Sequence, residues 1–67
     1  MGKNTILDEV KERAERYDRN TQNRNKELVK QRYHELRTLG MSSGMARIGC
    51  HYSTEKYLQL LDEIRNS

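Results

Sequence analysis

The spacing of the apolar residues restricts this chain to packed helices. They recur at three- and four-residue steps from Leu7 to Tyr17, again from Leu28 to Leu39, and again from Tyr57 to Ile64. No segment shows the two-residue alternation of a half-buried strand. The chain has no proline, and three of its four glycines lie within ten residues, at positions 40, 44 and 49. The pattern predicts an all-α protein whose later helices are separated by glycines.

Polar residues mark the ends of the first two helices. The first helix is expected to run to Arg19 from a capping-box-like start at Thr5. Residues 18–25 contain no apolar side chain and are expected to form a linker or a frayed helix end. An asparagine at position 23 or 25 is placed to cap a second helix, which ends where Gly40 suits the left-handed position after the last turn.

Serines mark the starts of the last two helices. Ser42 or Ser43 caps a short third helix that Gly49 ends, and Ser53 caps a fourth helix over residues 54–66. The apolar stripe of the fourth helix comprises Tyr57, Leu58, Leu61 and Ile64. The expected fold is an all-α bundle of three to four helices in a helix-turn-helix arrangement.

The chain is long enough for one small core. Only 33% of its 67 residues are hydrophobic and 34% are charged, so stability is expected to be marginal or to depend on a partner. We expect residues 1–20 to form an N-terminal helix that packs on the rest or pairs with a second copy as a homodimer. Residues 25–67 are expected to form the helix-turn-helix-like domain.

Several classes of protein do not fit this sequence. The longest apolar runs are pairs, which cannot span a bilayer, and the N-terminus lacks the apolar segment of a secretory signal. The single cysteine, Cys50, cannot form an internal disulfide, which favours a cytoplasmic protein. We expect no enzyme and no cofactor, because a chain of this size cannot enclose a water-free pocket. No metal site is expected, since Cys50, His51 and His34 lack metal-ligand spacing.

Positive charge is concentrated in the middle of the chain. Residues 21–47 carry six basic side chains and two acidic ones, whereas residues 1–20 are balanced and residues 48–67 carry two basic and three acidic groups. A basic second helix leading into a short helix is typical of a surface that contacts a polyanion. The alternative interpretation is an ordinary solvated helix face.

The later part of the chain resembles helix-turn-helix DNA-binding proteins. Ser53-x-x-x-Tyr57-x-x-x-Leu61 is similar to the start of the recognition helix in bacterial and phage repressors, and Met45-Ala46-Arg47 is similar to the preceding helix. Arg32-Tyr33 and Tyr52-Ser53 also resemble small phage regulators with a sigma-factor-like DNA-reading domain. The resemblance covers about residues 25–66. It implies a small transcriptional regulator, encoded by a phage or mobile element, that binds double-stranded DNA.

This resemblance assigns roles to two sets of side chains. Outward residues at the start of the fourth helix would contact base edges, namely Thr54, Glu55, Lys56 and Gln59. A second set would hold phosphates, namely Lys30, Arg37, Ser43, Arg47 and His51. For Ser43, simple helix capping is the alternative role.

The fourth helix also departs from the family pattern. It carries Lys56 and Arg65 against three acidic residues, and this balance opposes attraction to phosphate. One extra residue lies between Ala46 and Ser53. An alternative function is therefore a small helical protein that binds and modulates a host enzyme.

A third functional hypothesis comes from the last helix alone. Gln59, Leu61 and Asp62 are similar to the signature of helical-hairpin phosphatases that act on a response regulator, although Leu58 stands where that family has serine.

The four tyrosines at positions 17, 33, 52 and 57 favour core and rim positions over a base-stacking platform.

Overall fold

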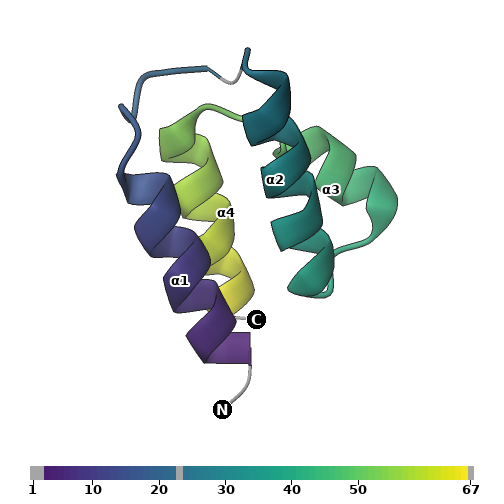
Figure 1. The fold of residues 1–67 in the computed structure, drawn as a ribbon. Helices are drawn as coiled ribbons and strands as arrows, with labels where there is room; N and C mark the ends of the chain where they lie inside the picture. The colour runs from purple at the N-terminus through teal and green to yellow at the C-terminus, as the bar shows by residue number, and fades with distance from the viewer. Residues whose placement is uncertain (1–2, 23, 67) are drawn as a thin grey trace.

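The chain folds into four helices with a common core (Figure 1). The computed structural model describes residues 3–22 and 24–66, with side chains from residue 5 onward. The helices are α1 (Lys3–Glu15), α2 (Lys26–Thr38), α3 (Ser43–Gly49) and α4 (Thr54–Asn66). Within these ranges there is no strand. The predicted all-α class and the order of the helices are confirmed.

The helices pack in two pairs, α1 with α4 and α3 with α2 (Figure 1). Every helix contributes to one hydrophobic cluster, whose buried members are Leu7, Val10, Ala14, Leu36, Leu39, Ala46, Tyr57, Leu58 and Leu61. The apolar stripe of α1 is therefore used inside the chain. The N-terminal helix therefore packs on the remainder of the chain, and its pairing with a second copy stays a prediction.

The ends of α2 follow the predicted caps. Asn25 is the N-cap, and its Oδ1 accepts a hydrogen bond of 2.9 Å from the Glu27 amide. Asn23 lies outside the described residues. At the other end, Gly40 has φ of 98°, and the Gly40 and Met41 amides donate to the carbonyls of Arg37 and Leu36. This is the double hydrogen bond of a Schellman motif, which requires a left-handed residue that glycine supplies without strain.

Serine caps open α3 and α4. The Ser42 hydroxyl accepts from the Met45 amide at 3.4 Å, and the Ser53 hydroxyl accepts from the Lys56 amide at 3.3 Å. Ser43 is the first residue of α3 and is exposed. Gly49 ends α3 in a tight position, because a Cβ there would lie 2.9 Å from side-chain carbons of Leu36 and Leu60.

The predicted bounds of α1 are wrong at both ends. The helix begins at Lys3, which places Thr5 inside it, and ends at Glu15 instead of Arg19. Beyond Glu15 the amides of Arg16 and Tyr17 make shorter-range hydrogen bonds to the carbonyls three residues before them, which closes the last turn. Asp8, which would complete a capping box with Thr5, is paired with Arg65 of α4.

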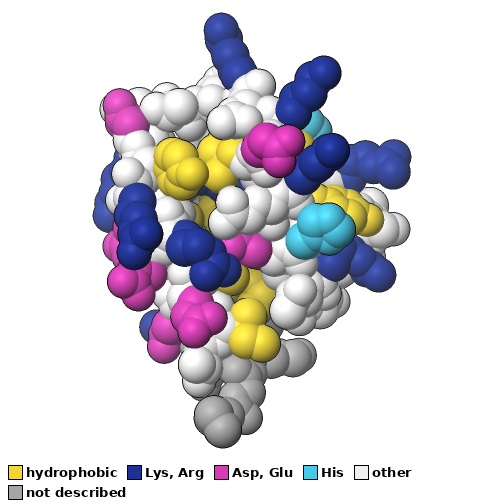
Figure 2. Space-filling model, in the orientation of Figure 1, with side chains coloured by type: hydrophobic (Ala, Val, Ile, Leu, Met, Phe, Trp, Pro, Cys, Tyr) yellow, Lys and Arg dark blue, Asp and Glu magenta, His cyan; other side chains and the backbone are white. Residues whose placement is uncertain are grey.

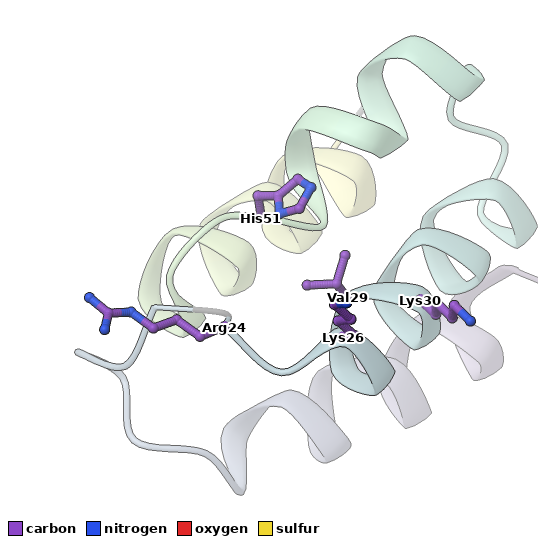
Figure 3. A pocket seen from close by; sticks show the side chains of 5 residues that line it. All are labelled: Arg24, Lys26, Val29, Lys30 and His51. Carbon is purple, nitrogen blue, oxygen red and sulfur yellow. The ribbon is translucent and has the colours of Figure 1, made fainter.

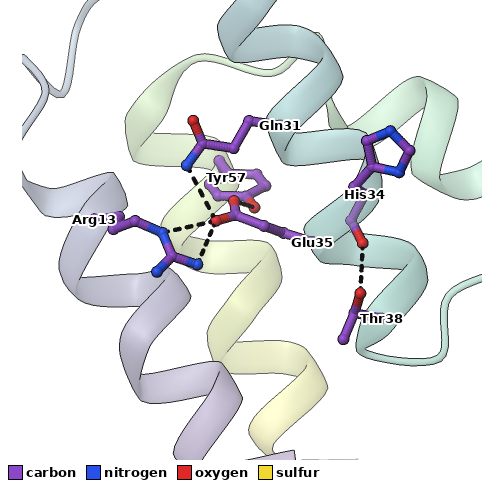
Figure 4. A network of polar contacts seen from close by, with 6 residues as sticks. All are labelled: Arg13, Gln31, His34, Glu35, Thr38 and Tyr57. Atoms are coloured by element: carbon purple, nitrogen blue, oxygen red, sulfur yellow. Dashed lines mark hydrogen bonds and ion pairs between the residues drawn. The ribbon is translucent and has the colours of Figure 1, made fainter.

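The partly buried carboxylate of Glu35 joins α1, α2 and α4 (Figure 4). Oε2 of Glu35 accepts from Nε and Nη2 of Arg13 at 3.0 and 2.8 Å, and Oε1 accepts from the Tyr57 hydroxyl at 2.9 Å. Only 11% of the Glu35 side chain is exposed. Burial, together with this carboxylate, raises the pKa of Tyr57 far above its ordinary value. The network fixes the rotation of α4 relative to α1 and α2.

Arg32 lies in the interior with 1% of its surface exposed. Its guanidinium carbon is 4.3 Å from the centre of the Tyr57 ring, and Nη2 donates to the Thr54 hydroxyl at 3.1 Å. Nη1 donates to the Tyr52 carbonyl at 3.4 Å. Burial lowers the pKa of Arg32, while the Glu35 carboxylate acts in the opposite direction. This residue therefore supports the start of α4 instead of adding charge to the surface.

In the part of the chain that the structure describes, none of the helices has the length and apolar character needed to cross a bilayer.

Candidate nucleic-acid interface

Thr54 does not contact solvent, so its predicted role as a base contact is wrong. It is 1% exposed, and its hydroxyl accepts the hydrogen bond from Arg32. Thr54 precedes Leu58 and Leu61 by four and seven residues, and this spacing puts it on the buried stripe of α4.

The chain's own linker covers the start of α4. We call residues 16–22 and 24–25 the linker. The Thr54 amide donates to the Thr21 carbonyl at 3.3 Å, and the Glu55 amide donates to the Arg19 carbonyl at 3.0 Å. These amides are two of those that an α-helix leaves without a helical partner. Figure 1 shows the linker passing over this end of α4. The first turn of α4 is therefore covered by the linker and does not protrude as a free helix end.

The other three predicted base contacts share an exposed side of α4. Glu55, Lys56 and Gln59 are all exposed, and their spacing places them within one helix face. The Lys56 ammonium lies 4.6 Å from the centre of the Tyr52 ring. Asp62 and Glu63 are exposed farther along the helix. Acidic groups outnumber basic ones on this face, which opposes close approach to a phosphate backbone.

Two of the predicted phosphate contacts meet at a hollow between the linker, α2 and the α3–α4 connection. Lys30 and His51 line it together with Arg24, Lys26 and Val29, and its volume is about 290 Å³. We call this hollow the basic cleft. Among the described residues that line it, none is acidic. In Figure 3, His51 lies opposite Val29, while Arg24 and Lys30 extend to opposite sides.

The remaining predicted phosphate contacts lie outside the basic cleft. Arg37, Ser43 and Arg47 are exposed on α2 and α3 but do not line the hollow. Arg37 is also engaged within the chain, because its Nη1 donates to the Met41 carbonyl at 2.8 Å. These residues can add to the field around the cleft without forming part of it.

No sequence motif assigns a site role to Arg24 or Lys26. Both belong to the basic middle of the chain, so charge counting includes them. Their grouping with His51 depends on the path of the linker, which no local sequence pattern specifies. The positive charge of residues 21–47 is thus the one sequence feature that indicates Arg24 and Lys26.

The surface over α2 and α3 is strongly basic. Figure 2 shows Lys and Arg side chains crowded over the upper part of this side, with few acidic side chains among them. Among the charges of residues 21–47, Arg32 is buried and the partly buried Glu35 is paired with Arg13, which takes one charge of each sign from the surface. The positive excess predicted for this stretch is therefore retained at the surface.

Comparisons with protein-family models, with curated proteins and with solved structures find no match for this chain.

Two other hypotheses from the sequence concern a metal site at Cys50 and His51 and a phosphatase-like motif in α4. Cys50 is 2% exposed and its thiol donates to the Arg47 carbonyl at 3.0 Å, whereas His51 is exposed. Burial raises the pKa of Cys50. The described residues hold no group of three His, Cys, Asp or Glu side chains suited to a metal ion. Asp62 of the phosphatase-like motif accepts from Lys11 at 2.9 Å.

Proposed function

We propose that this chain binds DNA through the phosphate backbone, using the basic cleft and the exposed cations beside it. The observation that carries the proposal is the composition of the cleft: Arg24, Lys26 and Lys30 surround it with His51, and no acidic residue is among its described lining. Such a surface attracts a polyanion over a range of about 10 Å at 0.1 M salt.

The arrangement of the cations favours a chain of phosphates over a single small anion. A compact anion site brings its donors together at one point, whereas Arg24 and Lys30 extend in opposite directions from the Val29 side of the cleft (Figure 3). Separated cations can each contact a different phosphate of one backbone. Backbone contacts of this kind position a protein on DNA without reading its sequence.

The proposal keeps the predicted double-stranded DNA partner but changes the contact surface. In a helix-turn-helix regulator the start of the last helix enters the major groove. Here the linker carbonyls occupy the first amides of α4, and its exposed side is mainly acidic. A regulatory role would then depend on binding of the basic cleft to DNA, with weak discrimination among DNA sequences.

A salt titration tests this proposal. Binding of a labelled DNA duplex should weaken as salt increases, with a slope of log affinity against log salt of about −0.9 for each phosphate contacted. The Lys30→Ala variant should bind more weakly and lose about one such increment of slope. Absence of binding by the wild type at low salt would end the proposal.

The Lys11→Ala variant is the matched control. It removes the same charge from α1, where Lys11 pairs with Asp62 at a distance of 2.9 Å between Nζ and Oδ1. Its slope should equal that of the wild type. An equal loss in Lys11→Ala and Lys30→Ala would show that net charge alone controls binding, and that the basic cleft has no special part.

A protein partner is a second candidate function, favoured by two exposed apolar residues of α3. Met45 is 51% exposed and Ile48 is 54% exposed. Exposed apolar side chains beside basic ones can form the centre of a protein interface. Capture of a host protein that survives nuclease treatment, and that is lost in a Met45→Ser/Ile48→Ser variant, would support this function. Capture unaffected by these substitutions would count against it.

A further inference from the structure

A second hollow lies beside the basic cleft and shares Arg24 with it. Its lining comprises Tyr17, Thr21, Gln22, Arg24, Asn25 and Leu28, and its volume is about 360 Å³. We call it the tyrosine pocket. Since Arg24 lines both hollows, a ligand that follows the basic cleft past this residue reaches the tyrosine pocket.

The tyrosine pocket combines a flat aromatic surface with amide groups. Tyr17 is 45% exposed, and the buried Arg32 guanidinium lies 5.8 Å from the centre of its ring. This cation–π contact holds the ring against the interior. Leu28 adds a 9% exposed apolar surface, and Gln22 and Asn25 add side-chain amides.

Asn25 also has a fixed position, because its Oδ1 caps α2 by accepting the Glu27 amide. An amide group held in this way can offer its N–H donors to a ligand without a large loss of side-chain freedom. The aromatic ring and the amides together match a nucleobase, which has a π-face for stacking and polar edges for hydrogen bonds.

We infer that the tyrosine pocket binds an unpaired base of a DNA strand whose phosphates lie along the basic cleft. This inference rests on the proposed function and extends its ligand from double-stranded DNA to single-stranded DNA, or DNA with an unpaired base. Arg24 lies at the junction, where it can contact the phosphate that links the stacked nucleotide to its neighbour. A paired duplex cannot fill the pocket without first unpairing and unstacking a base, which is unfavourable.

Two strands of equal length test the inference. One is a fluorescent oligothymidine, and the other is an abasic strand with the same number of phosphates and no bases. Stacking of a base on an aromatic side chain is sequence-tolerant, so the wild type should bind oligothymidine about fivefold or more tightly than the abasic strand at the same salt concentration. Equal affinity for the two strands would overturn the inference.

Substitutions at Tyr17 assign the effect to the pocket. Tyr17→Ala should remove the preference for oligothymidine over the abasic strand, while Tyr17→Phe, which keeps the ring, should retain it. Circular dichroism of each variant checks that the fold is intact. Retention of the full preference by a folded Tyr17→Ala variant would place the base contact elsewhere and overturn the inference.

A matched pair of arginine variants completes the test. Arg24→Ala should weaken binding of both strands, whereas Arg65→Ala, which removes an equal charge paired with Asp8 between α1 and α4, should not. Failure of the proposed function has a different result, because the wild type would then show no salt-dependent binding to duplex, oligothymidine or abasic strand.

Discussion

Arg32 shows how burial changes the meaning of a charged residue. In the sequence it is one of six basic residues in the middle of the chain, but in the fold it stacks on Tyr57 and donates to Thr54. Its spacing was available as a signal: Arg32 lies four residues after Leu28 and four before Leu36, on the buried stripe of α2. Charge counting alone gave it the wrong location.

Substitution of Arg32 should destabilise the fold according to the volume removed. Arg32→Ala should lower the free energy of unfolding by about 3 kcal/mol, because it leaves a cavity beside Tyr57 and removes donors from buried oxygens. Arg32→Met should cost less, since it fills the space and avoids the penalty of burying a cation. Urea unfolding measures both. An unchanged midpoint for Arg32→Ala would contradict the buried role.

Tyr57 should make stability fall at high pH. Burial and Glu35 raise its pKa in the folded state above the ordinary value of 10.0. Below pH 10 the hydroxyl is protonated in both states, so its contribution is fully present. As pH rises past 10, the unfolded state releases the proton more readily and is favoured, by up to about 1.4 kcal/mol per pH unit.

Comparison of the wild type with Tyr57→Phe isolates this effect from the other titrating groups. The substitution should cost about 1 kcal/mol near neutral pH, because Glu35 loses a donor. Above pH 10 the stability difference between the two proteins should shrink. A difference that stays constant between pH 8 and pH 11 would show that Tyr57 ionises equally in both states.

At the scale of the elements, caps and stripes could be predicted because they are local. Asn25, Gly40, Ser42 and Ser53 perform the capping roles that their residue types favour. The end of α1 could not be predicted in the same way. Beyond Glu15 the Arg19 carbonyl accepts a hydrogen bond from the Glu55 amide of α4 instead of continuing the helix. Such a tertiary backbone contact is not encoded in the local residue types.

Two glycines of α3 provide a matched pair of substitutions. Gly44→Ala should stabilise the protein by about 0.5–1 kcal/mol, because a Cβ there meets nothing within 4 Å and alanine favours the helix. Gly49→Ala should destabilise it by about 1–3 kcal/mol, since its Cβ would press against Leu36 and Leu60. Thermal unfolding measures both, and shifts of the same sign would contradict the packing of α3 against α2 and α4.

At the scale of the whole molecule, the candidate surface depends on how distant segments meet. Positive charge in residues 21–47 could be predicted from the sequence, as could Lys30 and His51. The basic cleft and the tyrosine pocket could not, because both are formed by the linker. Hydrogen bonds from α4 to the carbonyls of Arg19 and Thr21 set its path. Backbone contacts of this kind leave no pattern in the residue types.

The closed core predicts a chain that folds alone. Because α1 buries Leu7, Val10 and Ala14 within its own chain, the thermal midpoint should not depend on protein concentration. Leu7→Ala should lower the free energy of unfolding by about 2–5 kcal/mol, a large share of the stability of a small domain. A midpoint that rises with concentration would instead indicate the homodimer.

Amide chemical shifts recorded by NMR during titration with a DNA duplex, and then with a single strand, locate the contact surface directly. The strongest shifts should occur in residues 24–30 and at His51, around the basic cleft, with Tyr17 and Gln22 added for the single strand. The exposed side of α4, including Lys56, Gln59 and Glu63, should change little. Shifts concentrated on that side of α4 would contradict the basic cleft and support helix-turn-helix recognition, and the absence of shifts at low salt would contradict DNA binding altogether.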